Sequence, residues 1–393
     1  MTVLFATPYL GEIGEIDKGG GLESYLLRVA GALKKMGHTA IIMSLGSRDI
    51  HYIKDGIEHI FIDSPHKFLP TYGRIGLLYD RIVTSVHMNK KIKQLLKKRH
   101  IDIIQFPSPY ALALCYFAKT PAVMRLSSYS KMYGEFDAYD RREMDLYGLC
   151  ERLAAKRCNA VFAPSVFVAG VFSADIHRPV SVIESPFWNN CGEYDYSIYN
   201  EKLMNKKYFL YFGRLTEEKG TLVIAKCLRK FLETNPSFYF VCCGQNVNIN
   251  GKDAVDILEK AAGRYKNRFI YMQPLPHEKL YPIIQHASCV VCTSIIENLS
   301  NSCIEAMYFE RLVIGVYGAS YDQLIDDGKN GLLCKAGDSI SLLQKMNEAV
   351  VMDEKQRMEI GKKAKKRIER LAPEYVVEKL IRYYQYVINN VGK

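Results

Sequence analysis

The sequence predicts an α/β protein made of two Rossmann-like domains in series. Short apolar runs alternate with amphipathic helical patterns along most of the chain, as in doubly wound parallel sheets. The alternation stops once, in a polar, tyrosine-rich stretch at residues 189–206, and then resumes. A length of 393 residues also favours two domains over one.

The first half, assigned to a domain over residues 1–190, contains five predicted strands and four predicted helices. The strands are Val3–Ala6, Ala40–Met43, Ile103–Phe106, Ala122–Leu126 and Ala160–Ala163. The helices are Gly21–Met36, Arg74–Lys98, Tyr110–Phe117 and Arg141–Arg157. Residues 191–206 are predicted to be a linker.

The second half, residues 207–371, repeats the pattern. Its predicted strands are Tyr208–Phe212, Phe238–Cys243, Phe269–Tyr271, Cys289–Thr293 and Val313–Val316. Its predicted helices are Thr221–Thr234, Asp253–Tyr265, Glu278–His286, Ser302–Phe309, Ser339–Val351 and a basic one near Lys355–Leu371. Residues 372–393 carry a last helix, Tyr375–Asn389, that we expect to pack back on the first domain.

Composition places the chain among ordinary globular proteins, with 48% hydrophobic and 24% charged residues. No run of eighteen apolar residues predicts a membrane-spanning helix. Met1–Ala6 is predicted to be a first strand and not a leader, so we expect a cytoplasmic protein, at most peripheral on the inner face of the membrane. The eleven cysteines, several of them in apolar runs, are expected to be reduced structural thiols.

The net charge of +11 is concentrated in two helical segments, His87–His100 and Lys355–Arg370. Each is either a solvated helix face or a surface that attracts anionic lipid head groups or an anionic acceptor. Nucleic acid is not expected as a partner, because neither segment carries the interleaved aromatic residues that such modules use.

Candidate ligand-binding residues lie in the loops that follow predicted strands, where open α/β sheets bind their ligands. The first loop ends in Gly19-Gly20-Gly21 and opens a helix. It is either a phosphate site formed by backbone N–H groups or only a turn at a helix start. The fingerprint G-x-G-x-x-G is absent, and the second strand ends in Ser44-Leu45-Gly46 with no acidic residue, which argues against a dehydrogenase.

Two further loops belong to the second half. In Gly213–Gly220, Arg214 and Lys219 can converge on one diphosphate, unless the loop is simply exposed and its cations are incidental. In Glu297–Met307, Glu297 precedes a helix and Glu305 lies about one turn into it. Carboxylates at this spacing could hold sugar hydroxyls; alternatively, Glu305 only stabilises its own helix.

Taken in order, these segments resemble the retaining GT-B glycosyltransferases of the group 1 family, also called family 4. The most specific matches are G-R-L-x-x-x-K-G at Gly213–Gly220 and E-x7-E from Glu297 to Glu305. Gly37-His38 and the turn Asp327–Leu333 match as well, and the similarity extends over most of the chain. The resemblance implies a GT-B fold, in which two Rossmann-like domains face each other across a cleft.

The resemblance also implies roles for individual residues. Arg214 and Lys219 would bind the donor diphosphate and stabilise its developing charge, with Glu297 on the transferred sugar and Glu305 on the ribose. The remaining donor contacts would come from Gly20, Gly21, Asn298, Leu299, Ser300 and Asn301. No cofactor and no metal are expected, since the nucleotide sugar is a substrate.

One departure concerns a histidine that the family commonly carries after a strand of its first domain. Ser127 stands at that place, so Arg125 or Ser127 is the candidate for contacts with the sugar or the acceptor. Ser300 also replaces a frequent glycine. Retention by a front-face route needs no protein base, so the catalytic inference does not depend on the histidine.

The function predicted is a retaining hexosyltransferase that uses an NDP-sugar as its donor. UDP is the first expectation for the donor nucleotide, and GDP is the second. The expected acceptor is a lipid-linked glycan of bacterial surface polysaccharide assembly, with an anionic membrane surface as a further partner. The alternatives are a soluble acceptor, a nucleotide-sugar epimerase or phosphorylase of related shape, or a non-catalytic sugar-nucleotide-binding protein. The aromatic, basic stretch from Tyr129 to Arg142 is either a surface helix start or a segment that contacts the acceptor.

Overall fold

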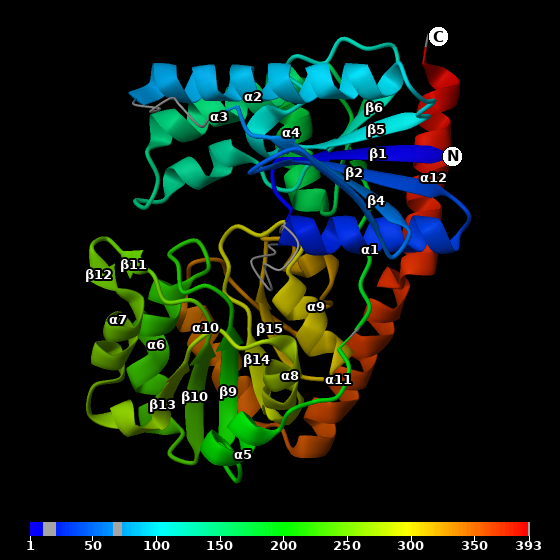
Figure 1. Ribbon diagram of the computed structural model, residues 1–393. Coiled ribbons are helices and arrows are strands. Elements are labelled where there is room, and N and C mark those ends of the chain that lie inside the picture. Colours follow the sequence, from blue (N-terminus) through cyan, green and yellow to red (C-terminus); the bar gives the residue numbers. More distant parts are fainter. Residues whose placement is uncertain (11–20, 66–72, 190, 392–393) are drawn as a thin grey trace. The chain divides into compact units, whose positions relative to one another are not determined.

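The structure of the protein is a computed structural model that describes residues 1–10, 21–65, 73–189 and 191–391 (Figure 1). The chain divides into two compact units. Unit 1 comprises Met1–Glu135, Tyr139–Phe187 and Leu371–Lys393, and unit 2 comprises Phe136–Ala138 and Trp188–Arg370.

Unit 1 is built on an eight-stranded sheet in the order β3-β4-β2-β1-β5-β6-β7-β8, parallel except for the pair β3–β4. The strands are β1 (Thr2–Thr7), β2 (Thr39–Gly46), β3 (Ile50–Lys54), β4 (Ile57–Asp63), β5 (Ile103–Pro107), β6 (Ala122–Arg125), β7 (Ala160–Ala163) and β8 (Ser181–Val182). The central strands are buried along almost their whole length, which explains their uninterrupted apolar sequences.

Helices cover both faces of this sheet, and Figure 1 shows α1 and α2 on opposite faces. The helices are α1 (Gly21–Lys35), α2 (Gly73–Leu96), α3 (Arg141–Ala155), α4 (Val166–Ile176) and α12 (Pro373–Asn390). The apolar side of α12 is buried in unit 1, and Tyr384 donates a hydrogen bond of 2.5 Å from its hydroxyl to Gln105 Oε1 on β5.

Four parts of unit 1 differ from the prediction. Helix α4 and the short strand β8 were not predicted. The hairpin β3–β4 was not predicted; it turns at Asp55-Gly56, where both residues have positive φ, as in tight two-residue hairpins. The helix predicted at Tyr110–Phe117 is wrong, because only Pro109–Ala111 forms one turn of 3-10 helix. Tyr110 and Ala111 both have positive φ, which no α-helix accepts.

Unit 2 contains a six-stranded, wholly parallel sheet in the order β13-β10-β9-β14-β15-β16. The strands are β9 (Lys207–Phe212), β10 (Phe238–Cys243), β13 (Phe269–Met272), β14 (Cys289–Val291), β15 (Val313–Val316) and β16 (Leu332–Cys334). A small separate hairpin joins β11 (Asn248–Ile249) to β12 (Lys252–Asp253).

The helices of unit 2 are α5 (Ser197–Lys202), α6 (Thr221–Thr234), α7 (Ala254–Ala262), α8 (His277–His286), α9 (Asn301–Tyr308), α10 (Ser339–Val351) and α11 (Glu354–Ile368). Helix α5 lies within the segment predicted to be a linker, and that segment is grouped with unit 2. All eleven cysteines are free thiols, as the sequence predicted.

Candidate functional site

The candidate site is formed by two loops of unit 2 that follow neighbouring strands, β9 and β14. The first loop runs from Gly213 to Gly220 and leads into α6, and Gly220 is its last residue before the helix. Gly220 has φ +80°, and a Cβ atom there would lie 2.2 Å from the carbonyl oxygen of Thr293. Only glycine permits this approach of the two loops.

Hydrogen bonds fix the two loops to each other. Thr293 Oγ1 donates to the carbonyl oxygen of Lys219 over 2.9 Å, and the amide of Ile295 donates to the carbonyl oxygen of Glu218 over 2.8 Å. Because strands β9 and β14 pair in parallel, both loops leave the same edge of the sheet. Side chains 78 residues apart in the sequence therefore meet at one place.

Lys219 and Glu297 form the central contact of the site. Lys219 Nζ lies 2.5 Å from Glu297 Oε2, and Ser294 Oγ donates to the same oxygen over 3.2 Å. Both side chains are partly exposed, 26% for Lys219 and 16% for Glu297. A ligand can reach the pair, because neither charge is sealed in the interior.

The backbone of Arg214 is hydrogen-bonded within the loop, whereas its guanidinium is largely exposed. Tyr211 Oη donates to the Arg214 carbonyl oxygen over 2.7 Å. The guanidinium is 58% exposed, and the buried carboxylate of Glu218 lies 3.9 Å from it. A contact of that length leaves most of the guanidinium donors available to an anionic ligand.

The second loop ends at the start of α9, where Ser300 is the N-cap. Ser300 Oγ accepts a hydrogen bond of 3.2 Å from the amide of Cys303, and Ser320 Oγ donates to the carbonyl oxygen of Glu297 over 3.1 Å. Leu299 and Ser300 are buried, whereas Asn301 is exposed. The positive end of the α9 dipole thus lies immediately after the loop that carries Glu297.

Glu305 lies on α9, with its side chain 9% exposed. His277, the first residue of α8, brings its Nε2 atom to 3.6 Å from Glu305 Oε1. His277 was not predicted as a site residue. The only sequence signal was its position shortly after the predicted strand Phe269–Tyr271, where a ligand-binding loop is expected.

The turn at Asp327–Gly331 is organised by its own polar side chains. Asn330 accepts from the amide of Asp326 over 2.7 Å and donates to the carbonyl oxygen of Leu324 over 3.1 Å. Asp327 Oδ1 accepts from the amide of Leu333 over 2.8 Å. The polar residues Asp327 and Asn330 therefore stabilise the turn that leads into β16.

The site residues predicted in unit 1 fall into two groups. Gly20 lies outside the described residues, and Gly21 begins α1. Arg125 ends β6, and its guanidinium donates to Ser127 Oγ over 2.7 Å and to Ser185 Oγ over 2.9 Å. The guanidinium also lies 3.7 Å from the centre of the Tyr25 ring.

Arg125 is thus brought together with Ser127, but in the interior of unit 1. Only 5% of the residue is exposed, and this burial lowers the pKa of Arg125 from its ordinary value. No carboxylate within the described ranges lies within 4.0 Å of its guanidinium. A buried cation without an anionic partner is costly, so its hydrogen bonds to serine and its contact with Tyr25 must offset part of that cost.

No group of three or more His, Cys, Asp or Glu side chains is arranged to hold a metal ion in the part of the chain that the structure describes. Among the same residues, no helix has both the length and the apolar character needed to span a membrane.

Comparison with known proteins identifies the family. Residues 198–367 match the family described as glycosyl transferases group 1, and residues 19–186 match glycosyltransferase family 4. The chain is a GT-B glycosyltransferase of this group 1 and family 4 type. The two matches are consecutive and together extend over most of the sequence.

Individual relatives of the glycosyltransferase are distant. A Campylobacter jejuni protein named "GalNAc-alpha-(1->4)-GalNAc-alpha-(1->3)-diNAcBac-PP-undecaprenol alpha-1,4-N-acetyl-D-galactosaminyltransferase" is 24% identical, over 94% of this chain and 96% of its own length. Sucrose-phosphate synthase from Thermosynechococcus elongatus superposes with a TM-score of 0.78 at 14% identity, with 99% of both chains covered. Anabaena HepE, solved with UDP and glucose, superposes with a TM-score of 0.72 at 18% identity, covering 98% of this chain and 100% of its own.

These comparisons confirm the predicted fold class and family of the glycosyltransferase. Within unit 2, the structure brings Arg214, Lys219 and Glu297 onto two adjoining loops and places Glu305 on the helix that follows the second loop.

Proposed function

We propose that this glycosyltransferase moves a hexose-type sugar from an NDP-sugar, UDP before GDP, to a lipid-linked glycan, with retention of the anomeric configuration. The observation that carries the donor half of the proposal is the contact of Lys219 with Glu297, and the loop of Lys219 also carries the exposed guanidinium of Arg214. Cations for a diphosphate and a carboxylate for sugar hydroxyls are then available on two adjoining loops.

Lys219 and Glu297 would exchange partners when the donor binds. The diphosphate binds both Lys219 and Arg214. Because Lys219 then no longer pairs with Glu297, the carboxylate of Glu297 can accept hydrogen bonds from the hydroxyl groups of the sugar. The exchange keeps each charge compensated, which matters because both groups are more than two-thirds buried.

The transfer step then breaks the bond between the anomeric carbon and the phosphate oxygen of the donor. Negative charge grows on the departing diphosphate, and Arg214 and Lys219 stabilise it more strongly than they stabilise the intact donor. The acceptor hydroxyl oxygen forms the new bond to the anomeric carbon from the same face, and its proton passes to the departing phosphate oxygen. No base from the protein is required for this balance.

Glu305 is assigned to the nucleotide ribose. Its carboxylate can accept hydrogen bonds from two neighbouring hydroxyl groups, and it is nearly buried, so such bonds would be little weakened by water. His277, whose Nε2 atom lies 3.6 Å from the carboxylate, would orient it. The Anabaena HepE complex with UDP and glucose supports a UDP-sugar as the first donor to test.

The acceptor half of the proposal rests on α2. Ile75, Tyr79, Ile82 and Val86 are each at least 40% exposed. At about 100° per residue they lie along one face of the helix. An apolar stripe of this kind on a solvent-exposed face is unusual for a soluble protein.

Basic residues continue the same face toward the end of α2. Lys90 and Lys93 are exposed, and the helical period places them in line with the apolar stripe. Lys97, also exposed, directly follows the last residue of α2. Apolar residues that enter the head-group region and cations that meet anionic lipids are the two components of peripheral membrane binding. This combination favours a lipid-linked acceptor, and the name of the Campylobacter jejuni relative, with its PP-undecaprenol acceptor, supports the same choice.

The donor is tested with a panel of UDP- and GDP-sugars, by titration calorimetry and slow hydrolysis, on the wild type, Arg214→Ala and Glu305→Ala. We expect one donor to bind tightly and both substitutions to weaken it at least tenfold. Binding of no nucleotide sugar, or binding that ignores both substitutions, would overturn the donor assignment.

The acceptor is tested with vesicles of neutral lipid and vesicles that contain anionic lipid. We expect salt-sensitive binding to the anionic vesicles, lost in the double variant Ile82→Ser, Lys93→Glu. Lys363→Glu on α11 is the matched control, since that helix is basic but carries no comparable apolar stripe among its exposed residues. Equal partitioning to both vesicle types would favour a soluble acceptor.

A further inference from the structure

The opposite edge of the unit 2 sheet holds a basic cavity that the proposed transfer does not use. Lys207 begins β9, Ser288 precedes β14 and Leu312 precedes β15, and all three line this cavity. The cavity therefore lies at the amino ends of the strands, whereas the donor residues follow the carboxyl ends. Its volume is about 180 Å³.

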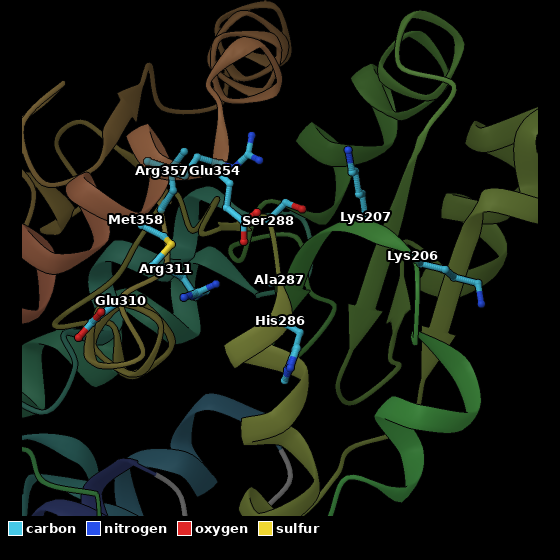
Figure 2. Close-up of a pocket in the computed structure, with 11 residues that line it drawn as sticks. Lys206, Lys207, His286, Ala287, Ser288, Glu310, Arg311, Glu354, Arg357 and Met358 are labelled. Atoms are coloured by element: carbon cyan, nitrogen blue, oxygen red, sulfur yellow. The ribbon is translucent and has the colours of Figure 1, made fainter.

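Figure 2 shows the side chains that line the cavity. Four of them are cationic: Lys206, Lys207, Arg311 and Arg357. Lys206 extends away from the others, and its Nζ lies 5.7 Å from the centre of the Tyr239 ring. The cations available to the cavity are thus the other three.

Arg311 is only partly satisfied by the protein. Its Nε donates to the carbonyl oxygen of Phe309 over 3.0 Å, close to the end of α9. Its two terminal nitrogens have no hydrogen-bond partner in the described part of the chain. The residue is half-buried, and burial lowers the pKa of Arg311.

Arg357 is arranged in a similar way. Its Nη1 donates to the carbonyl oxygens of Ala349 over 3.2 Å and Met352 over 2.5 Å, at the end of α10. This capping employs one nitrogen of the guanidinium, and Nη2 bonds to none of the described residues. The structural role of each arginine, as a cap for helix carbonyl groups, therefore leaves donors unused.

Two carboxylates, Glu310 and Glu354, also line the cavity, and their charges raise the pKa of Arg311 against the lowering by burial, but neither forms an ion pair with Arg311 or Arg357. Glu310 is bound by Lys365 at 2.9 Å, and Glu354 is an exposed residue at the start of α11. Within the described ranges, no carboxylate oxygen lies within 4.0 Å of Arg311 or Arg357. Half-buried guanidinium groups that have no directly paired carboxylate can still bind an anion, because binding one compensates their lost hydration.

A second cavity, of about 320 Å³, adjoins the first and shares Glu310 and Arg311 with it. Its other lining residues include Tyr194, Tyr308 and Phe309. The Tyr194 and Phe309 rings lie 6.1 Å apart at 73°. Tyr194 belongs to the tyrosine-rich stretch that the sequence predicted to be a linker. Aromatic rings offer flat apolar surfaces to the C–H faces of a sugar.

We propose that the two adjoining cavities form a second binding site of this protein, for a phosphorylated sugar. The phosphate would bind Arg311 and Arg357, with Lys207 at the rim, and the sugar would lie toward Tyr194 and Phe309. The site is separate from the donor residues, but α9 connects them: its first turn follows Glu297, and its last residues line the second cavity. A ligand here can therefore influence donor binding through one rigid helix.

The experiment measures binding of inorganic phosphate and of glucose 6-phosphate to the full chain by titration calorimetry. We expect glucose 6-phosphate to bind more tightly than phosphate, and Lys207→Glu and Arg311→Gln to weaken both at least tenfold. Lys207 is exposed, so Lys207→Glu remains informative if Arg311→Gln fails to fold. Lys260→Glu, on the exposed side of α7, is the matched control and should bind as the wild type does.

Arg214→Ala separates this site from the donor site. If phosphate binding is lost in Arg214→Ala and kept in Lys207→Glu, the phosphate occupies the donor site and the proposal is overturned. Absence of binding by either probe overturns it as well. If glucose 6-phosphate binds no better than phosphate, or if Tyr194→Ala leaves its advantage unchanged, the assignment of the aromatic cavity to the sugar is wrong.

Discussion

Lys219 Nζ lies 2.5 Å from Glu297 Oε2, and this ion pair joins the two sequence motifs that resemble the donor site of the family. The pair is formed because β9 and β14 are neighbours in the sheet, so that the loops that follow them leave the same edge. Lys219 offers a positive charge to a diphosphate, and Glu297 offers a hydrogen-bond acceptor to the hydroxyl groups of a sugar.

Replacement of Lys219 by alanine should reduce kcat/KM about 100- to 1,000-fold, the loss typical for removal of one group that stabilises transition-state charge. The variant should also lose roughly 1–3 kcal/mol of stability, because the pair is more than two-thirds buried and Glu297 is left without its cation. Steady-state kinetics and thermal unfolding measure the two effects. Loss of activity that only parallels loss of folded protein would speak against a catalytic role.

Replacement of Glu305 by glutamine should raise the donor KM about tenfold and change kcat little, because a ribose contact is made equally before and during the transfer. His277→Ala should have a smaller effect, since the histidine is 58% exposed and 3.6 Å from the carboxylate. Glu359→Gln, exposed on α11, is the control. A fall in kcat with unchanged KM would place Glu305 at the reacting bonds instead.

Replacement of Gly220 by alanine should destabilise the protein by more than about 2 kcal/mol and abolish activity. The residue has φ +80°, and the added Cβ would collide with the carbonyl oxygen of Thr293. Gly170→Ala is the matched control, because Gly170 lies on an exposed face of α4 with no atom within 4 Å of its added Cβ. That change should stabilise the protein by up to about 1 kcal/mol. Denaturant unfolding of both variants checks the contrast.

The sequence was sufficient where a local pattern fixes the structure. Buried parallel strands such as β1 and β9 are apolar along their length, and α6 shows a clear helical period, so both kinds of element were predicted. The hairpin β3–β4 was missed because β3 is a largely exposed edge strand that lacks a continuous apolar run; its Asp55-Gly56 turn was the available signal.

Tertiary contacts explain why the helix predicted at Tyr110–Phe117 does not form. In the segment Tyr110–Phe117, the carbonyl oxygen of Leu112 and the amide of Cys115 bond to the Ser85 hydroxyl on α2 in place of helical partners. The hydrophobic periodicity of the sequence does not indicate such bonds. The contact of Lys219 with Glu297 and that of His277 with Glu305 also depend on the folded arrangement of segments far apart in the chain, so motifs alone did not predict them.

Addition of EDTA should leave the rate of sugar transfer unchanged. Arg214 and Lys219 can supply the positive charge that the departing diphosphate requires, without a divalent cation. Turnover measured before and after chelation, and again after addition of magnesium or manganese ions, checks this. Loss of turnover that a divalent ion restores would show that the two cations are not sufficient.

Glu151 on α3 should make the stability of unit 1 depend on pH. The side chain is buried, and desolvation raises its pKa to about 8, although hydrogen bonds from the Ser130 amide and hydroxyl and the charges of Arg81 and Arg152 lower it. The folded protein therefore retains a proton that the unfolded chain loses near its ordinary pKa of about 4.5.

The sign of the effect follows from this proton. The contribution of Glu151 to stability is fully present below about pH 4.5, falls by up to about 1.4 kcal/mol per pH unit as the pH rises, and levels off above about pH 8. Glu151→Gln keeps both contacts with Ser130 and carries no charge, so the gap in unfolding free energy between variant and wild type should widen from pH 5 to pH 8 in favour of the variant. Denaturant unfolding at several pH values measures this gap. A constant gap would mean that Glu151 is already ionised in the folded protein at pH 5.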